Sequence, residues 1–300
     1  MRVKFRNRCI REPYVQWCER TEGETPPPTR CSDSKHTIPS NYCFCFLLSL
    51  IILYIVITNS YMKLPDKISP NPLLSSVVDI RFLSNIVPSE LLSSVVPILS
   101  KEFPNIVHSN IPFAIKGDPQ FQFLAEYVFS NDKFSVSIDN NVISFENLGN
   151  YYGWSIYYEL IKSVLKKLNP ILKPSKIIRV AARYISLFNS PDKLSENIII
   201  SEPFQKLSNI VQKNLAIESS FIKEDFQIRL KVSQNGTVRT GLISKKGMYI
   251  DIDTAKEVQL PTSFNDDLFE IIGNTHFQGK SFFFNLLQPA FLNSLNPEYK

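Results

Sequence analysis

Apolar residues recur with two different periods in residues 62–300, and these periods predict an α+β fold. Alternating apolar and polar positions predict strands, whereas apolar positions spaced three and four residues apart predict helices. Helical spacing covers residues 151–168 and about 265–287, and a third helix begins at Pro88. The predicted strands are 73–83, 121–129, 134–138, 142–146, 177–188, 210–220, 225–233, 237–244 and 248–252. Because short turns join most of these strands, we expect antiparallel pairing.

Proline and glycine residues set the predicted ends of several elements. Pro97 predicts a kink or an early end in the helix that begins at Pro88, and Pro170 predicts the end of the helix 151–168. An Asn-Gly pair at 235–236 and a Lys-Gly pair at 246–247 predict hairpin turns between the last strands.

The two halves of this region repeat one order of elements, β-α-βββ-α in residues 62–170 and β-(α)-ββββ-α in residues 171–300. Their first strands align Val-Asp-Ile-Arg-Phe-Leu at 78–83 with Val-Ala-Ala-Arg-Tyr-Ile at 180–185. This agreement predicts an internal duplication of a β-α-βββ-α unit. We expect two related α+β halves that share one curved antiparallel sheet, with long helices packed on it.

Residues 1–61 have a different composition, and two interpretations of them are open. They contain all five cysteines, at spacings that match neither a zinc site nor a redox motif. Residues 42–58 form an uncharged apolar run, which predicts a single-pass membrane anchor with residues 1–41 in the cytoplasm. Alternatively, translation starts at Met62, where the composition changes, and the protein is cytoplasmic. The predicted membrane contact depends on residues 42–58 being translated.

Charge and motifs exclude several classes of protein. Residues 1–61 carry three of the five net positive charges, so the remainder gives no electrostatic case for binding nucleic acid. The sequence has no glycine-rich dinucleotide motif, no phosphate-binding loop and no nucleophile elbow. We therefore expect no cofactor, and the sequence favours a protein that is not an enzyme.

Three arginines are candidates for binding an anionic ligand. Arg179 and Arg183 lie on the same face of one predicted strand, and Arg81 occupies the position that matches Arg183 in the repeat. Guanidinium groups so arranged can hold an anion by paired hydrogen bonds. The alternative is that each arginine pairs with a carboxylate across the sheet, with Asp79 a candidate partner for Arg81.

The candidate catalytic groups are Asp251, Asp253 and His276. The two aspartates share a face at a predicted strand end, where they can hold Mg²⁺ or simply cap a turn. No further ligand accompanies them in the sequence, so we expect no metal site. His276 lies on or beside the apolar stripe of the last helix, where a histidine is usually satisfied by one hydrogen bond.

Aromatic residues provide the candidate interface. Tyr152 and Trp154 belong to the aromatic run 151–154, which can line a ligand cavity, form a protein interface, or fill the layer between helix and sheet. Phe282, Phe283 and Phe284 point in three directions around a helix, so at least one must face a neighbouring element, a partner subunit or solvent.

Four segments resemble a sporadically distributed family of bacterial proteins of unknown function. They are 62–82, 152–154, 183–185, and 251–253 together with the helix through His276 and Phe282-Phe283. The resemblance spans nearly all of residues 62–300 and implies a cytoplasmic bacterial protein without supplying an activity. Where the family has asparagine after Arg-Tyr-Ile, this chain has Ser186.

Two functions follow as expectations. The first is a binding or regulatory protein that uses its aromatic residues to contact a protein partner or a second copy of itself. The second is a small-ligand-binding protein or a hydrolase with a pocket between sheet and helices. If the arginines, the aspartates and His276 converge in one pocket, the second is favoured.

Overall fold

The computed structural model describes residues 63–84, 86–109, 121–172, 176–189, 194–200, 214–240, 243–262 and 264–299. Contacts within the chain separate Met1–Met62 from Lys63–Lys300, and every described residue belongs to the second unit. The predicted anchor 42–58 and the five cysteines therefore lie outside the described residues. None of the helices that the structure describes is long and apolar enough to cross a membrane.

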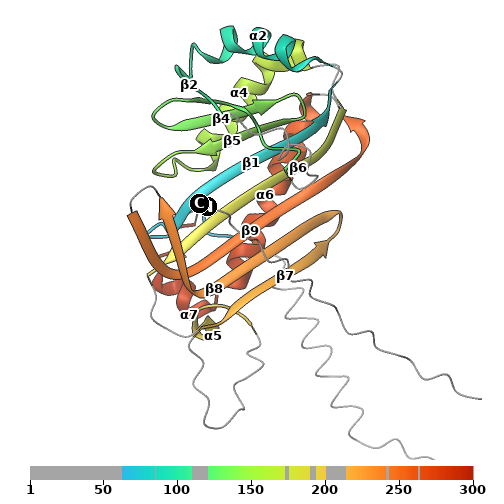
Figure 1. Cartoon of the computed structure of the whole chain (residues 1–300). Helices are drawn as coiled ribbons and strands as arrows, with labels where there is room; N and C mark the ends of the chain where they lie inside the picture. The colour runs from blue at the N-terminus through green and yellow to red at the C-terminus, as the bar shows by residue number, and fades with distance from the viewer. Residues whose placement is uncertain are drawn as a thin grey trace, which may run out of the picture. The chain divides into compact units, whose positions relative to one another are not determined.

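Nine strands of the described chain form one antiparallel sheet in the order β2-β3-β4-β5-β1-β6-β9-β8-β7 (Figure 1). β1 and β6 lie side by side at its centre, with Asp79 opposite Ala181. The predicted α+β class is confirmed. The strands are β1 Leu73–Leu83, β2 Asn105–His108, β3 Tyr127–Ser130, β4 Phe134–Asp139, β5 Val142–Asn147, β6 Lys176–Phe188, β7 Ala216–Lys223, β8 Phe226–Thr240 and β9 Ile243–Thr262.

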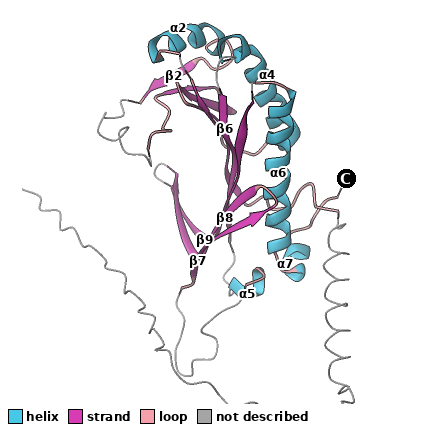
Figure 2. Cartoon of the chain, turned by 90° about the vertical axis from the view of Figure 1, so that its right-hand side faces the viewer, coloured by secondary structure: helices cyan, strands magenta, loops and turns pink. Residues whose placement is uncertain are grey.

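The helices gather on one face of the sheet. Figure 2 shows α2, α4, α6 and α7 on the same side of the curved strands, and no described helix covers the opposite side, which we call the open face. Along β1, Val78, Ile80 and Phe82 are buried towards the helices, whereas the residues between them face the open side. The helices are α2 Pro88–Leu99, α4 Trp154–Leu172, α5 Leu194–Asn197, α6 Asp266–Leu286 and α7 Pro289–Ser294.

The predicted helix ends are only partly correct. α4 continues through Pro170 to Leu172, so the predicted stop at Pro170 is wrong. Leu168 and Leu172 are both fully buried in the core, and their packing holds the last turn despite the N–H group that proline lacks. Pro97 lies in the last turn of α2, which ends at Leu99.

The two predicted glycine turns are wrong, because both glycines lie inside long strands. β8 and β9 are each continuous, and Gly236 and Gly247 face each other across the pair. A Cβ atom at Gly236 would lie 2.4 Å from the Cβ of Tyr249, and one at Gly247 would lie 2.2 Å from the carbonyl oxygen of Phe188. Glycine is therefore needed here for close approach of backbones and side chains, and not for a turn.

The remaining strand predictions differ at their ends. β3 begins at Tyr127 and not at 121, and the short edge strand β2 was not predicted. All four residues of β2 are exposed, so it lacks the alternation of buried and exposed positions that reveals the inner strands.

Candidate functional site

The alternation of side chains along β6 divides the predicted site residues between two faces of the sheet. Tyr184 and Ser186 lie on the helix-covered face, where Val180 also joins the core. Arg179 and Arg183 lie on the open face, in ion pairs with carboxylates from the neighbouring strands. The predicted arginines, aspartates and His276 therefore do not converge in one pocket.

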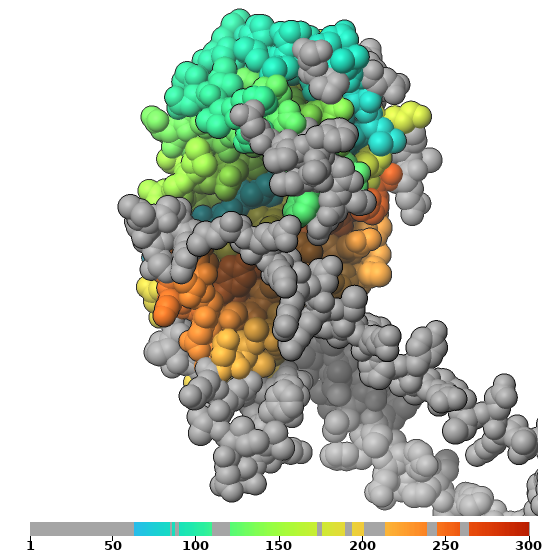
Figure 3. Space-filling view, viewed as in Figure 1, coloured from blue at the N-terminus to red at the C-terminus, as the bar shows by residue number. Residues whose placement is uncertain are grey.

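The open face carries a row of alternating charges that we call the charged ladder. Arg81 donates from Nε to Asp79 over 3.1 Å, as predicted for the paired alternative. Arg179 has carboxylate oxygens of Asp79 at 3.7 Å and of Asp253 at 3.5 Å. Figure 3 turns this face to the viewer, with parts of β1 and β9 visible in its recessed middle. The charged ladder consists of Asp79, Arg81, Arg179, Arg183, Arg229, Asp251, Asp253 and Glu257.

The most buried group of the charged ladder is Asp251, whose side chain is 4% exposed. Arg183 donates to both of its carboxylate oxygens, over 2.9 and 2.7 Å, and the Tyr249 hydroxyl donates to it over 2.9 Å. Burial, followed by the charge of Asp251, raises the pKa of Tyr249 to about 12, so this hydroxyl keeps its proton. These contacts occupy the carboxylate as a structural ion pair.

Asp251 and Asp253 do lie on one face, but in the middle of β9 and not at a strand end. Their oxygens contact guanidinium groups, Arg183 for the first and Arg229 for the second. In the part of the chain that the structure describes, no group of three or more histidine, cysteine or acidic residues is placed to hold a metal ion.

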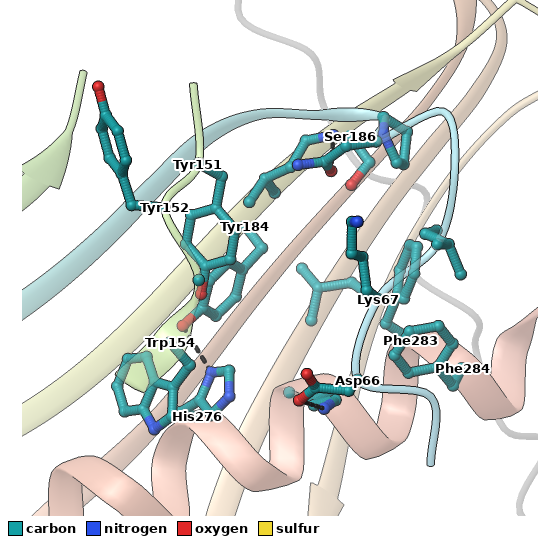
Figure 4. Close-up of a pocket in the computed structure, with 18 of the residues that line it drawn as sticks. Asp66, Lys67, Tyr151, Tyr152, Trp154, Tyr184, Ser186, His276, Phe283 and Phe284 are labelled. Carbon is teal, nitrogen blue, oxygen red and sulfur yellow. Dashed lines mark hydrogen bonds and ion pairs between the residues drawn. The ribbon is translucent and has the colours of Figure 1, made fainter. Parts of the chain in front are cut away.

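The helix-covered face contains a cavity of about 550 Å³ that we call the aromatic cavity. Its walls come from the segment 66–73, the start of α4, the second half of β6 and the second half of α6 (Figure 4). A cavity of this volume is large enough for a small organic molecule. Its labelled lining residues are Asp66, Lys67, Tyr151, Tyr152, Trp154, Tyr184, Ser186, His276, Phe283 and Phe284.

A stack of rings forms one wall of the aromatic cavity. The ring centroids of Trp154 and His276 are 3.8 Å apart with 10° between their planes, and the Tyr158 ring stacks on Trp154 at a centroid distance of 5.2 Å. Trp154 is the first residue of α4, and Gly153 before it has φ +93°, a conformation that favours glycine. The helix start thus places the indole ring against α6.

His276 is held neutral by its surroundings. Its Nδ1 lies 2.7 Å from the Tyr184 hydroxyl, and burial followed by the charge of Lys280 lowers its pKa to about 3. Burial raises the pKa of Tyr184 well above its ordinary value, so the phenol also keeps its proton. We infer that the phenol O–H donates to Nδ1, which leaves Nε2 as the nitrogen that carries hydrogen.

The predicted aromatic interface residues divide between the cavity and the core. Phe283 and Phe284 line the aromatic cavity, whereas the Phe282 ring lies 5.2 Å from that of Phe221 on β7. Tyr152 remains 37% exposed at the cavity rim. The aromatic run 151–154 therefore lines a cavity, and Tyr151 and Trp154 also pack against the core between helix and sheet, so two of its three predicted roles are seen.

Several lining residues were not predicted as site residues. Tyr184 and Ser186 could not be predicted, because the alternation along β6 shows which residues share a face of the sheet but not which of them line a cavity. Asp66 and Lys67 precede the first strand, and Lys280 follows His276 by one helical turn, but only the folded chain brings these segments together. Lys280 and Asp66 are 3.9 Å apart at this site.

Comparison with known proteins gives no family for this chain. No protein-family model matches it, and no curated protein matches it significantly. The resemblance to a bacterial family of unknown function therefore stays a prediction, and the function is argued from the geometry alone.

Proposed function

We propose that residues 63–299 form a binding protein for a small, planar organic molecule, which occupies the aromatic cavity. The observation that carries this proposal is the convergence of six aromatic side chains, from the start of α4, β6 and α6, on one cavity of about 550 Å³. Flat faces of tyrosine, tryptophan and phenylalanine favour a ligand that can stack between them. The few polar groups among these rings would fix its orientation.

The same geometry favours binding over acid–base catalysis. A histidine with a pKa of about 3 is neither a charged acid nor an effective base at neutral pH. Tyr184 keeps its proton because burial raises its pKa. The predicted arginines and aspartates lie on the opposite face of the sheet, across the backbone from His276, so they are not available to a hydrolase site in the aromatic cavity.

Calorimetric titration of the full chain with 2-naphthol tests the proposal. A neutral probe of ~11 heavy atoms that gains about 0.5 kcal/mol per atom should bind with a dissociation constant on the order of 100 μM. Trp154→Ala removes one wall of the cavity and should abolish the binding heat. Trp17→Ala, which changes the other tryptophan of the chain, is the matched control and should bind like the parent.

Trp154→Ala also removes packing between α4 and α6, so a second variant separates binding from folding. Ser186→Leu places an apolar side chain into the cavity from β6 and should weaken binding of 2-naphthol while the circular dichroism spectrum stays unchanged. Equal binding by the parent and both cavity variants would mean that the probe binds elsewhere, and the proposal would fail.

The alternative of a protein partner has weaker support. This alternative depends on Phe282, Phe283 and Phe284 being available to a partner. Their rings contact Phe221, Phe188 and one another. None of the three is among the exposed large apolar side chains of the described residues. Of the predicted interface residues, Tyr152 alone belongs to that exposed set in the described chain. We therefore keep the small-molecule ligand as the single proposed function.

We also propose that the two halves arose by duplication of a β-α-βββ-α unit. Two features support this: β1 and β6 are neighbours at the centre, and each pairs on its outer side with the last strand of its own half, β5 or β9. In each half the next helix along the chain, α4 or α6, returns to the same face of the sheet (Figure 2). The expected result of superposing the two halves is that α4 falls on α6.

A further inference from the structure

We infer that the ligand of the aromatic cavity carries an uncharged hydrogen-bond acceptor on the edge of its planar ring, and that the Nε2–H group of His276 binds this acceptor. A ring carbonyl or a pyridine-type nitrogen is such an acceptor. This inference rests on the proposed function and adds the chemical class of the ligand to it. His276 is then the residue that determines specificity, and Tyr184 is the residue that positions it.

His276 lies on the face of α6 that forms one wall of the cavity. Gly279, Lys280 and Phe283 follow it at spacings of three, four and seven residues, and all three line the cavity. Nε2 is at the far end of the imidazole from the helix backbone, so a histidine on this face extends Nε2 towards the cavity. In Figure 4 the dashed line marks the contact with Tyr184, and the free edge of the ring faces the space between the labelled side chains.

Two contacts fix the ring and its tautomer. The Trp154 ring covers one face of the imidazole, with centroids 3.8 Å apart, and holds its plane. The Tyr184 oxygen lies 2.7 Å from Nδ1. The phenol O–H is the better donor and a bare imidazole nitrogen the better acceptor, so the bond runs from Tyr184 to Nδ1. A neutral imidazole has one N–H group, which must then be at Nε2.

The Nε2–H group is a donor at the cavity wall that needs an acceptor. In the described chain, the bond at Nδ1 is the one hydrogen bond that His276 makes. The hydroxyls of Tyr184 and Ser186 can each donate or accept, so they do not choose between ligands, whereas Nε2–H can only donate. A ligand acceptor would offset the cost of taking this N–H group out of water. The ligand edge that meets His276 is therefore an acceptor and not a donor.

The charged side chains at the cavity favour an uncharged acceptor over an anionic one. The Lys280 ammonium lies 3.9 Å from a carboxylate oxygen of Asp66. The Lys67 ammonium lies 3.4 Å from a carboxylate oxygen of Glu298. Because each lysine already has a carboxylate partner, a charged ligand of either sign gains little from these pairs. A carbonyl or a ring nitrogen satisfies Nε2–H without bringing a net charge among the aromatic rings.

Isoquinoline and naphthalene form a probe pair that tests the inference. Both are flat and, at slightly alkaline pH, uncharged, but only isoquinoline has an acceptor on its edge. Equilibrium dialysis against the full chain measures a dissociation constant for each. Tyr184→Phe/His276→Phe keeps a ring against Trp154, removes the donor and leaves no phenol unpaired. It should weaken isoquinoline about fivefold or more and naphthalene less than about twofold. His108→Phe, outside the lining, is the control and should bind both probes like the parent.

Nitrogen-15 NMR of the full chain with labelled histidine shows the tautomer directly, because protonated and bare ring nitrogens resonate far apart. The chain has three histidines, and His276→Phe identifies the signals of His276. In the parent we expect a bare Nδ1 and a protonated Nε2, with a larger Nε2 shift on adding isoquinoline than on adding naphthalene. In Tyr184→Phe we expect a mixture of both tautomers, because Nδ1 has lost its donor.

The outcomes separate this inference from the proposed function. If the double variant weakens both probes equally, or if Nε2 is bare in the parent, the inference is overturned while the proposed function stands. If neither probe binds the parent, the inference and the proposed function fail together. If Tyr184→Phe has the same tautomer as the parent, Tyr184 does not position His276, and that part of the inference is wrong.

Discussion

The neutral His276 gives the protein a specific dependence of stability on pH. Its pKa is about 3 in the folded state and about 6.5 in an unfolded chain, so the unfolded state binds the proton more readily between these values. Stability from this group is complete above the unfolded pKa and is lost as the pH falls towards 3. Between about pH 7 and about pH 5 the loss amounts to about 2 kcal/mol of unfolding free energy. It stays near that value for any folded pKa below about 4, because the unfolded histidine takes up the proton in this window.

Urea unfolding followed by circular dichroism measures this effect. His276→Gln keeps a hydrogen-bond acceptor for Tyr184 but does not titrate, so its loss of stability from pH 7 to pH 5 should be smaller than that of the parent by about 2 kcal/mol. The comparison uses the change with pH within each variant, so the cost of the substitution itself, which is the same at both pH values, cancels. His108→Gln, at a half-exposed side chain, is the control and should behave like the parent. Equal pH dependence in the parent and in His276→Gln would refute the buried, neutral histidine.

Two further predictions concern the β-sheet and its packing. Gly247→Ala should destabilise the protein by about 2 kcal/mol or more in thermal unfolding, because the added Cβ meets a β6 carbonyl oxygen at 2.2 Å. Gly273→Ala, inside α6, should instead stabilise the protein by about 0.5 kcal/mol, because a Cβ there would lie 3.7 Å from its nearest neighbour, the Tyr158 hydroxyl oxygen. If both substitutions stabilised the protein, or both destabilised it, this account would be contradicted. Arg183→Met should cost about 3 kcal/mol in urea unfolding, because it leaves the buried Asp251 without its cation. Lys231→Met removes an exposed ion pair with Glu218 and should cost less than about 1 kcal/mol of unfolding free energy. Similar losses in the two variants would show that burial of Asp251 does not make its ion pair more important for stability.

The elements that could be predicted are those whose pattern is set by burial on one face. β1 has the predicted bounds, 73–83, because alternate residues along it are buried under the helices. α6 has nearly its predicted ends, because Asn265 caps it and its apolar stripe faces the sheet. In both cases a local signal and the tertiary packing agree.

Predictions from glycine and proline failed where packing outweighed the local preference. The Asn-Gly pair at 235–236 is a strong hairpin signal, yet β8 continues through it with a shift in its register against β9 between Ser233 and Gly236, because β8 pairs with β9 on either side of this point. Gly247 is required by the Phe188 carbonyl oxygen, a contact that depends on the pairing of β6 with β9. Such contacts between distant segments leave no trace in the local sequence.

The period of two along β6 explains both the success and the failure in predicting the site. It correctly placed Arg179 and Arg183 together, but it also places Tyr184 and Ser186 on the opposite face, although Tyr184 is the very next residue after Arg183. Neighbouring residues of β6 point to opposite faces of the sheet, so the charged ladder and the aromatic cavity lie on different faces although their residues are adjacent in the sequence. A shift of one residue in this strand would bury guanidinium groups beside Trp154 and expose Tyr184, so the pairing of β6 with β1 and β9 determines which residues can meet a ligand. The lining of the cavity thus depends on how β6 is paired with β1 and β9. Substitutions that shift this pairing should abolish binding of the proposed ligand, even where every lining residue is kept.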